Sequence, residues 1–353
     1  MNDSQEKPLN GTTDRLQQVL QGNRRALAQL LTDIENERDG AENLLTRLYP
    51  HTGRAWLIGV TGAPGTGKST LVTALAKAYR AAGVSVGILA VDPTSPFTGG
   101  AILGDRIRMR DLSGDPGIFI RSMATRGSLG GLARAARDAA RAFDAAGFEI
   151  VLIETVGAGQ SEVEIARLAH TTLVVEAPGL GDDVQAIKAG ILEIADVLVV
   201  NKADRAGVNV TVRALKNMLE LGHPSSRSTL TAHHGQLMAV AHAPNDGQMA
   251  PLWVPPIVQT VASEHKGIDE VVSAVAAHRA FLSDEATFQA VERRQIELEL
   301  HQRLRERLMA RLLRELSAEG FAEIVEQVQR RQLAPQEAVA ALLKDDLPRD
   351  HTQ

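Results

Sequence analysis

Residues 62–69 of the chain combine glycine, lysine and serine at a spacing that can bind phosphate groups. The pattern is Gly-x-x-x-x-Gly-Lys-Ser, and it follows an apolar stretch that begins at Ala55. A loop of this kind between a strand and a helix presents backbone N–H groups and a helix amino end to phosphate oxygens. We therefore expect a phosphate-binding loop formed by Gly62, Ala63, Pro64, Gly65, Thr66, Gly67, Lys68, Ser69 and Thr70.

Two side chains of this loop have expected roles of their own. Lys68 should bridge β- and γ-phosphate oxygens, and the Ser69 hydroxyl should coordinate Mg²⁺. The alternative is a surface turn rich in Gly and Pro that matches the pattern by chance. Apolar residues on both sides of the loop favour a strand and a helix, and hence the phosphate loop.

A second segment, Asn201-Lys202-Ala203-Asp204, follows an apolar run and has the residues to select guanine. Asp204 is placed to accept hydrogen bonds from guanine N1–H and the exocyclic amine, a pair of donors that adenine lacks. Asn201 would tie the base-binding loop to the phosphate loop, and the Lys202 stem would cover one face of the ring. A strand end followed by a polar turn is the alternative. The phosphate loop upstream favours guanine binding.

A third contact to the base is expected after the last strand, at Val261, Ala262 and Ser263. In switch GTPases a Ser-Ala pair at this point offers a backbone N–H to guanine O6. The chain keeps the small residue but lacks the leading serine. Because the contact is made by the backbone, we expect it to tolerate this change.

Three carboxylates are candidates for the Mg²⁺ side of the site. Asp92 ends the apolar run 87–91, and a carboxylate at the carboxyl end of a strand faces the ligand crevice of an open α/β sheet. Asp105 lies in the Gly-rich stretch 97–108, which we interpret as a mobile switch. Glu154 ends another apolar run and would hold Mg²⁺ through water.

The residues after Glu154 indicate a second switch. The Gly157 N–H would sense the γ-phosphate, and the loop would relax when that phosphate leaves. Gln160 is a candidate to orient the attacking water, although it stands three residues beyond the glycine. Lys188 either pairs with Glu154 in one nucleotide state or is a solvated helix lysine. The expected catalytic residues are Lys68, Asp92, Asp105, Gln160 and Lys188.

Five motifs stand in the order typical of one family: Gly-Ala-Pro-Gly-x-Gly-Lys-Ser-Thr, Val-Asp-Pro, Thr-Gly-Gly-x-Ile-Leu-Gly-Asp, Glu-Thr-Val-Gly-x-Gly-Gln-Ser-Glu and Asn-Lys-Ala-Asp. They resemble the MeaB/ArgK-type GTPases of the SIMIBI class of P-loop GTPases. These are the G-protein chaperones of methylmalonyl-CoA mutase and related adenosylcobalamin-dependent acyl-CoA mutases. The resemblance runs from about residue 12 to about residue 280.

This resemblance implies a homodimer that binds a mutase and hydrolyses GTP slowly alone and faster with its partner. The cycle would gate cofactor loading and protect or repair the mutase. The chain lacks the cobalamin-binding string Asp-x-His-x-x-Gly, so adenosylcobalamin would be met only through the partner mutase. A metallochaperone GTPase for metallocentre assembly and a small-molecule kinase are the alternatives. Such metallochaperones usually carry a Cys-Pro-His or His-rich metal-binding segment, and this chain has neither. The guanine motif argues against the kinase.

Composition excludes several other classes of protein. The 353 residues include 43 acidic and 38 basic side chains, a net charge of −5, and no basic stripe, so nucleic acid is not an expected partner. The absence of cysteine excludes disulfides and thiolate metal sites. No apolar run approaches the ~18–20 residues of a membrane span, and the N-terminus has no apolar signal region. We expect a cytoplasmic protein with no membrane partner.

The predicted fold class is α/β: a P-loop NTPase with a mostly parallel central sheet flanked by helices, plus helical extensions at both ends. Residues 1–53 would form the N-terminal extension, with 1–12 disordered and 13–50 an amphipathic helical lead-in. The GTPase domain would span 54–283, and residues 284–353 would form a dimerisation arm. Strands are expected near 55–61, 86–91, 117–121, 149–154, 172–176, 196–200 and 256–261.

Two further segments lie outside these motifs. An insertion at 222–255 holds four histidines whose spacing matches no usual ligand pattern, so we expect a polar loop. In the arm, apolar residues recur every four positions from Ile296, which indicates a packing or dimer face. Folding back on the GTPase domain remains the alternative. Gly320 is expected to break this helix, and a shorter helix to follow from Pro335.

Overall fold

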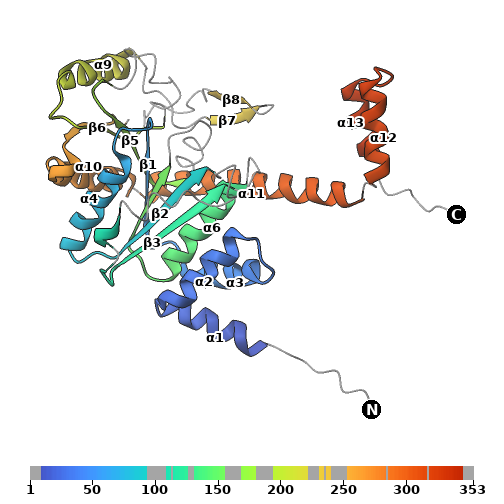
Figure 1. Cartoon of the computed structure of the whole chain (residues 1–353), viewed down its shortest axis with the longest axis horizontal. Helices are drawn as coiled ribbons and strands as arrows, with labels where there is room; N and C mark the ends of the chain where they lie inside the picture. Colours follow the sequence, from blue (N-terminus) through green and yellow to red (C-terminus); the bar gives the residue numbers. More distant parts are fainter. Residues whose placement is uncertain are drawn as a thin grey trace. The chain divides into compact units, whose positions relative to one another are not determined.

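The structure, a computed structural model, describes residues 9–93, 109–112, 114–125, 131–155, 168–179, 194–221, 230–233, 236–239, 253–283, 285–315 and 318–344. The chain divides into two compact units, Met1–Glu285 and Ala286–Gln353 (Figure 1). The predicted boundaries of the three domains stay a prediction.

The first unit is built on a seven-stranded sheet with the order β3-β2-β4-β1-β5-β6-β9. All pairings in this sheet are parallel, which confirms the predicted α/β fold class. Strands β4, β5 and β6 are buried along their whole length, as expected for a parallel sheet that is covered on both faces. The strands are β1 Trp56–Thr61, β2 Val86–Pro93, β3 Ile118–Thr125, β4 Ile150–Thr155, β5 Thr171–Glu176, β6 Val197–Asn201 and β9 Ile257–Thr260.

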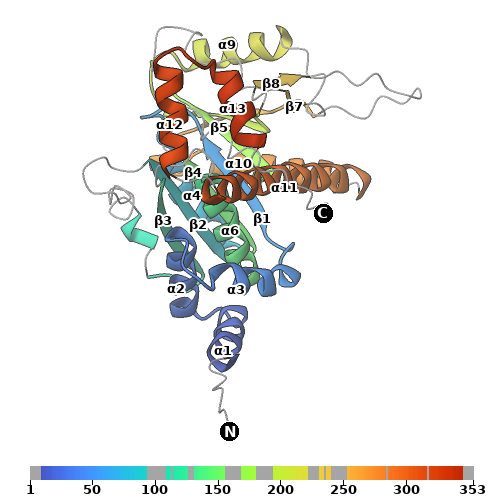
Figure 2. The ribbon, with the colours of Figure 1, turned by 90° about the vertical axis from the view of Figure 1, so that its right-hand side faces the viewer.

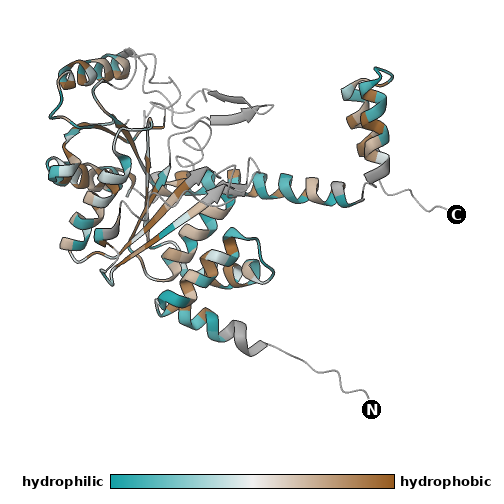
Figure 3. Ribbon diagram, in the orientation of Figure 1, coloured by the Kyte–Doolittle hydropathy of each residue, from teal (hydrophilic) through white to brown (hydrophobic). Residues whose placement is uncertain are grey.

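Helices cover the sheet on both faces. Val151 and Ile153 of β4 belong to one apolar core with α6, Gly131–Ala145, and alternate residues of a strand point to opposite faces. On the other face, which lies behind the sheet in Figure 2, α4, Lys68–Ala81, packs against β4 and against α10, Ile268–Leu282 (Figure 1). Helix α9, Val208–Leu221, packs on β6. The strands of the sheet are largely apolar, as their colouring in Figure 3 shows.

The N-terminal lead-in consists of three helices, α1 Leu9–Leu20, α2 Arg24–Glu35 and α3 Ala41–Leu48. The periodic apolar residues of α2 are buried against α6, which confirms the predicted amphipathic helices. The prediction of disorder is wrong for residues 9–12, because α1 already begins at Leu9. Leu16 and Val19 anchor that helix in the core. Residues 1–8 lie outside the described residues.

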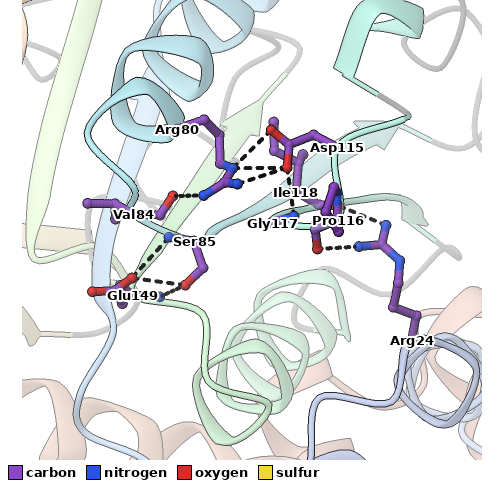
Figure 4. Close-up of polar contacts among 9 residues, drawn as sticks. All are labelled: Arg24, Arg80, Val84, Ser85, Asp115, Pro116, Gly117, Ile118 and Glu149. Atoms are coloured by element: carbon purple, nitrogen blue, oxygen red, sulfur yellow. Dashed lines mark hydrogen bonds and ion pairs between the residues drawn. The ribbon is translucent and has the colours of Figure 1, made fainter.

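Hydrogen bonds fasten the loop before β3 to its neighbours at the amino end of the sheet (Figure 4). Arg80 of α4 donates from Nε to the Asp115 carboxylate at 3.0 and 3.1 Å and from Nη1 to the Val84 carbonyl at 3.0 Å. The hydrogen bond from Arg80 lowers the pKa of Asp115. Arg24 at the start of α2 donates to the carbonyls of Pro116 and Ile118 at 2.9 and 2.7 Å. These contacts hold the lead-in to β3, on the edge of the sheet.

The insertion contains a small hairpin, so the expected polar loop is wrong for its described residues. Strand β7, Leu230–His233, pairs antiparallel with β8, Gln236–Ala239. A His-Gly pair separates the two runs in the sequence, and a short Gly-containing connection is a hairpin signal. Among the described residues, no group of three His, Cys, Asp or Glu side chains is arranged to hold a metal ion.

The second unit is helical, with α11 Glu285–Glu315, α12 Ala318–Gln329 and α13 Pro335–Lys344. Helix α13 confirms the short helix expected from Pro335. Gly320 lies inside α12, so the expected break at this residue is wrong. The α11 helix ends at Glu315 instead, and one glycine costs a helix only about 1 kcal/mol. The α11 residues Ile296, Leu300, Leu304 and Leu308 are 38–62% exposed. No described helix of the chain is long and apolar enough to cross a membrane.

The first unit also contains short 3-10 helices, η1 Tyr49–His51, η2 Arg110–Leu112 and η4 Ala262–Glu264.

Candidate nucleotide-binding site

The phosphate loop connects β1 to α4 in the middle of the sheet. Two of its glycines cannot carry a side chain. Gly62 has a φ of 135°, and a Cβ there would lie 2.1 Å from the Val175 carbonyl oxygen. Gly67 has a φ of 93°, and its Cβ would lie 2.4 Å from Asn201 Nδ2. The loop therefore runs directly against β5 on one side and the base motif on the other.

Lys68 is buried at the start of α4 and points back into the loop. Its Nζ donates hydrogen bonds to the carbonyl oxygens of Gly62 at 2.8 Å and Ala63 at 3.0 Å. Thr66 is also buried, and its hydroxyl donates to the Ala63 carbonyl at 2.9 Å. The other loop residues Pro64, Gly65 and Thr70 are exposed. The two hydrogen bonds of Lys68 hold its ammonium group at the loop, where phosphate oxygens would replace the loop carbonyls as acceptors.

Ser69 and Glu154 place two oxygen ligands next to each other at the amino end of α4. The Ser69 hydroxyl donates to Glu154 Oε1 at 2.6 Å, and Glu154 is buried at the end of β4. Magnesium prefers hard oxygen ligands such as hydroxyls and carboxylates, and it keeps part of its water shell. This pair of side chains therefore fits Mg²⁺.

Asn201 joins the base motif to the phosphate loop. It is buried at the end of β6, and its Nδ2 donates to the Thr66 carbonyl at 2.8 Å. Its Oδ1 accepts from the Thr260 hydroxyl and from the Ala262 N–H, both at 3.1 Å. Thr260 was not among the residues singled out from the sequence, because a threonine at a strand end is an ordinary β-branched strand residue.

Lys202 and Asp204 follow on the surface of this loop. Lys202 has a φ of 58°, and its Nζ donates to the Gly65 carbonyl at 2.6 Å, which is a second link to the phosphate loop. Asp204 is exposed. Lys266 pairs with Glu264 at 2.7 Å, and this hydrogen bond raises the pKa of Lys266, with a smaller contribution from the charge of Asp204. The base motif and the turn after β9 are therefore neighbours.

A family model described as methylmalonyl-CoA mutase-associated GTPase MeaB matches residues 27–317. The chain belongs to this family.

Individual relatives agree with the match. The MeaB-family chain is 42% identical over 330 residues to a protein of Pyrococcus abyssi that is named a GTPase, covering 94% of this chain and 95% of the relative. It is 36% identical over 287 residues to the GTPase ArgK of Escherichia coli, covering 80% of each chain. A solved structure titled LAO/AO transport system kinase superposes with a TM-score of 0.68 at 25% identity, covering 96% of this chain and 99% of that one. The MeaB-family protein binds guanine nucleotide and hydrolyses GTP.

The turn after β9 carries the three residues that are expected to contact the base in this MeaB-family protein. The Val261 N–H donates to the Lys266 carbonyl at 3.0 Å, and the Ala262 N–H donates to Asn201. Both donors therefore have partners within the protein. The contact of this turn to guanine O6 stays a prediction.

Of the remaining predicted site residues, Asp92 lies within the part of the chain that the structure describes. Asp92 lies near the carboxyl end of β2, in register with Ala124 of β3. The carboxyl ends of β1, β2, β4 and β6 meet at one edge of the parallel sheet, so these candidates share that edge. The other candidates of the MeaB-family site lie outside the described residues: Asp105, Gly157, Gln160 and Lys188.

Proposed function

We propose that the protein uses GTP binding and hydrolysis to gate adenosylcobalamin loading of methylmalonyl-CoA mutase, or a related acyl-CoA mutase, and to protect or repair it in the cytoplasm. The match to a mutase-associated GTPase family supports the mutase as partner. The observation that supports the nucleotide cycle is the buried hydrogen bond between Asn201 and Thr66. This bond connects the base motif directly to the phosphate loop, so base recognition and phosphate binding belong to one hydrogen-bonded unit.

We assign phosphate binding to the loop from Gly62 to Thr70. Lys68 would exchange its two loop carbonyls for β- and γ-phosphate oxygens, a stronger pairing because the acceptors are charged. Ser69 and Glu154 would hold Mg²⁺, with Asp92 and Asp105 on the same side. When bound, Mg²⁺ supplies positive charge that neutralises the phosphate oxygens. Gly157, Gln160 and Lys188 keep their proposed switch and catalytic roles.

Base selection is assigned to Asp204, with Lys202 over one face of the ring. Asp204 is exposed, so it is ready to pair with the N1–H and amino group of an incoming guanine. Adenine would bury the carboxylate without donors, and leaving a buried charged acceptor unpaired is costly. The Ser263 N–H would complete recognition at O6.

The long helix α11 is proposed as part of a homodimer contact. Its apolar residues recur every four positions from Ile296 to Leu308 and are exposed. Exposed apolar stripes of this kind are typical of helix–helix association surfaces. The family resemblance supports the same assignment.

The test is GTP turnover by this protein alone and with each adenosylcobalamin-dependent mutase of the same organism. A saturable rise with one mutase is expected, and it would identify the partner. Lys68→Ala with the same mutase is the control, because it should abolish the rise. If tight GTP binding is accompanied by no rise with any mutase, the chaperone proposal is wrong and metallocentre assembly becomes the better alternative.

Small-molecule kinase activity is the second candidate, since the related solved structure is of a protein named a kinase. Competition between ATP and GTP for the site separates the two functions. The carboxylate of Asp204 predicts that GTP binds far better than ATP. Equal binding of the two nucleotides would contradict the guanine switch and favour a kinase.

A further inference from the structure

Two adjacent residues at the end of β4 contact the two ends of the phosphate loop. Glu154 accepts a hydrogen bond from Ser69, at the point where the loop becomes α4. Thr155 donates a hydrogen bond from its hydroxyl to the hydroxyl of Thr61, at 3.2 Å. Thr61 is the last residue of β1 and immediately precedes Gly62. The end of β4 therefore holds the loop at its entry and at its exit.

The two contacts lie on opposite faces of the sheet. Successive residues of a strand point to opposite faces, so Glu154 faces α4 whereas Thr155 shares the other face with Ile153 and Val151. Thr155 and Thr61 are 1% and 0% exposed. A buried hydroxyl needs a partner inside the protein, and each of these two threonines supplies one for the other.

The position of Thr61 determines the position of the loop carbonyl that Lys68 uses. Thr61 is in register with Val174 of β5, and the next residue, Gly62, runs against the Val175 carbonyl without room for a Cβ. The Gly62 carbonyl accepts the hydrogen bond from Lys68. A shift of Thr61 would therefore shift the lysine that we assign to the phosphates.

We propose that the hydroxyl bond between Thr155 and Thr61 positions the phosphate loop for GTP hydrolysis. Ser69 and Glu154 are assigned to Mg²⁺ at the nucleotide. Their hydrogen bond to each other would therefore have to rearrange when they bind the metal ion. The threonine pair lies on the opposite face of β4 from Glu154 and shares no hydrogen bond with Ser69, so it would keep β4 and β1 joined during that exchange. Thr155 and Thr61 are positioning residues, and their role rests on the proposed assignment of the phosphate loop.

Thr155→Val tests this inference, because valine keeps the volume and branching of threonine but removes the hydroxyl. We expect kcat for GTP hydrolysis to fall about two- to tenfold, the range for loss of one neutral hydrogen bond. The dissociation constant of GDP should change less than kcat does, because the base contacts are unchanged and GDP lacks the γ-phosphate. Thr61→Val should behave in the same way, and the double variant should be no slower than either single variant. Thr155→Ser should restore kcat.

Thr172→Val is the matched control. Thr172 is equally buried, at the amino end of β5, whereas the phosphate loop lies at the carboxyl end of the sheet. Wild-type kcat in both Thr155→Val and Thr61→Val would overturn the inference. The inference would also be overturned if Thr155→Val and Thr61→Val lost kcat, GDP affinity and melting temperature to the same degree and Thr172→Val showed the same losses. Lys68→Ala reports separately on the phosphate loop: if it still hydrolyses GTP at the wild-type rate, the assignment of the loop is wrong, whatever the threonine variants show.

Discussion

Asn201 and Thr66 are 135 positions apart in the chain, yet the Asn201 side-chain amide donates to the Thr66 carbonyl at 2.8 Å. The same amide accepts one hydrogen bond from Thr260, at the end of β9, and one from Ala262, in the turn that follows. One buried side chain therefore joins three loops that the parallel sheet brings to the same edge. The amide orientation follows from this pattern, because its oxygen faces two donors and its nitrogen faces a carbonyl.

Asn201→Ala should weaken nucleotide binding through lost loop geometry. The variant removes three hydrogen bonds and leaves the Thr66 carbonyl and the Ala262 N–H without their partner. We expect a loss of about 1–3 kcal/mol in GDP binding, or roughly five- to 150-fold in the dissociation constant. Titration with a fluorescent guanine nucleotide measures the effect. Thr260→Val, which removes one of the three bonds, is the graded control and should show a smaller loss.

Asp204→Asn should change which base the site prefers. An asparagine amide can donate to the C2 oxygen of xanthine, whereas the aspartate pairs with the amino group of guanine. We expect GTP affinity to fall by about 2 kcal/mol or more and xanthosine triphosphate affinity to rise. Competition between the two nucleotides measures the change. An unchanged preference for GTP would remove Asp204 from base recognition, and Asp269→Asn, at the exposed start of α10, controls for the lost charge.

Ser263→Pro should remove a contact to guanine O6 without removing a side chain that the site uses. Proline lacks the N–H and is tolerated in the first turn of a helix, the position that Ser263 has in η4. We expect GTP affinity to fall by about 1 kcal/mol, with no loss for the 2-aminopurine analogue, which lacks O6. Equal losses for both nucleotides would indicate a distorted turn instead of a lost contact.

The strands and the phosphate loop were predictable because their signals are local. Apolar runs of five to eight residues indicate buried strands, and the glycine and lysine spacing of the phosphate loop requires a strand before it and a helix after it. The same local signals failed for Gly320, because a helix tolerates one glycine. They also failed for the β7–β8 hairpin, whose short strands lack a long apolar run.

Contacts between distant buried polar residues could not be predicted in this way. Thr155 and Thr61 are 94 positions apart, and each is an ordinary strand residue by itself. His278 lies in α10, yet its ring pairs with Asp196 before β6 at 2.9 Å and with the Thr171 hydroxyl at 3.0 Å. The sequence carries no spacing rule for such pairs, because the sheet order and register decide which residues meet.

His170 makes the stability of the fold depend on pH. It precedes β5, and its Nδ1 accepts a hydrogen bond from the Leu57 N–H at 3.1 Å. Burial, with a smaller contribution from Arg279, lowers the pKa of His170 from 6.5 to about 4. The unfolded chain therefore takes up a proton below about pH 6.5 that the folded chain refuses until about pH 4. The contribution of the neutral His170 to the free energy of unfolding is fully present above pH 6.5. It falls by up to about 3 kcal/mol as the pH drops to 4.

His170→Asn tests this dependence, because the asparagine oxygen can still accept from Leu57 but does not titrate. Urea unfolding of the wild-type protein and the variant at pH 7, 5.5 and 4.5 measures the free energy of unfolding. The difference between the two proteins should shrink or reverse in favour of the variant as the pH falls, since only the wild-type protein loses the contribution of the neutral imidazole. His51→Asn, which removes an exposed imidazole, is the control. Parallel stability curves for wild type and His170→Asn would show that another buried group carries the pH dependence.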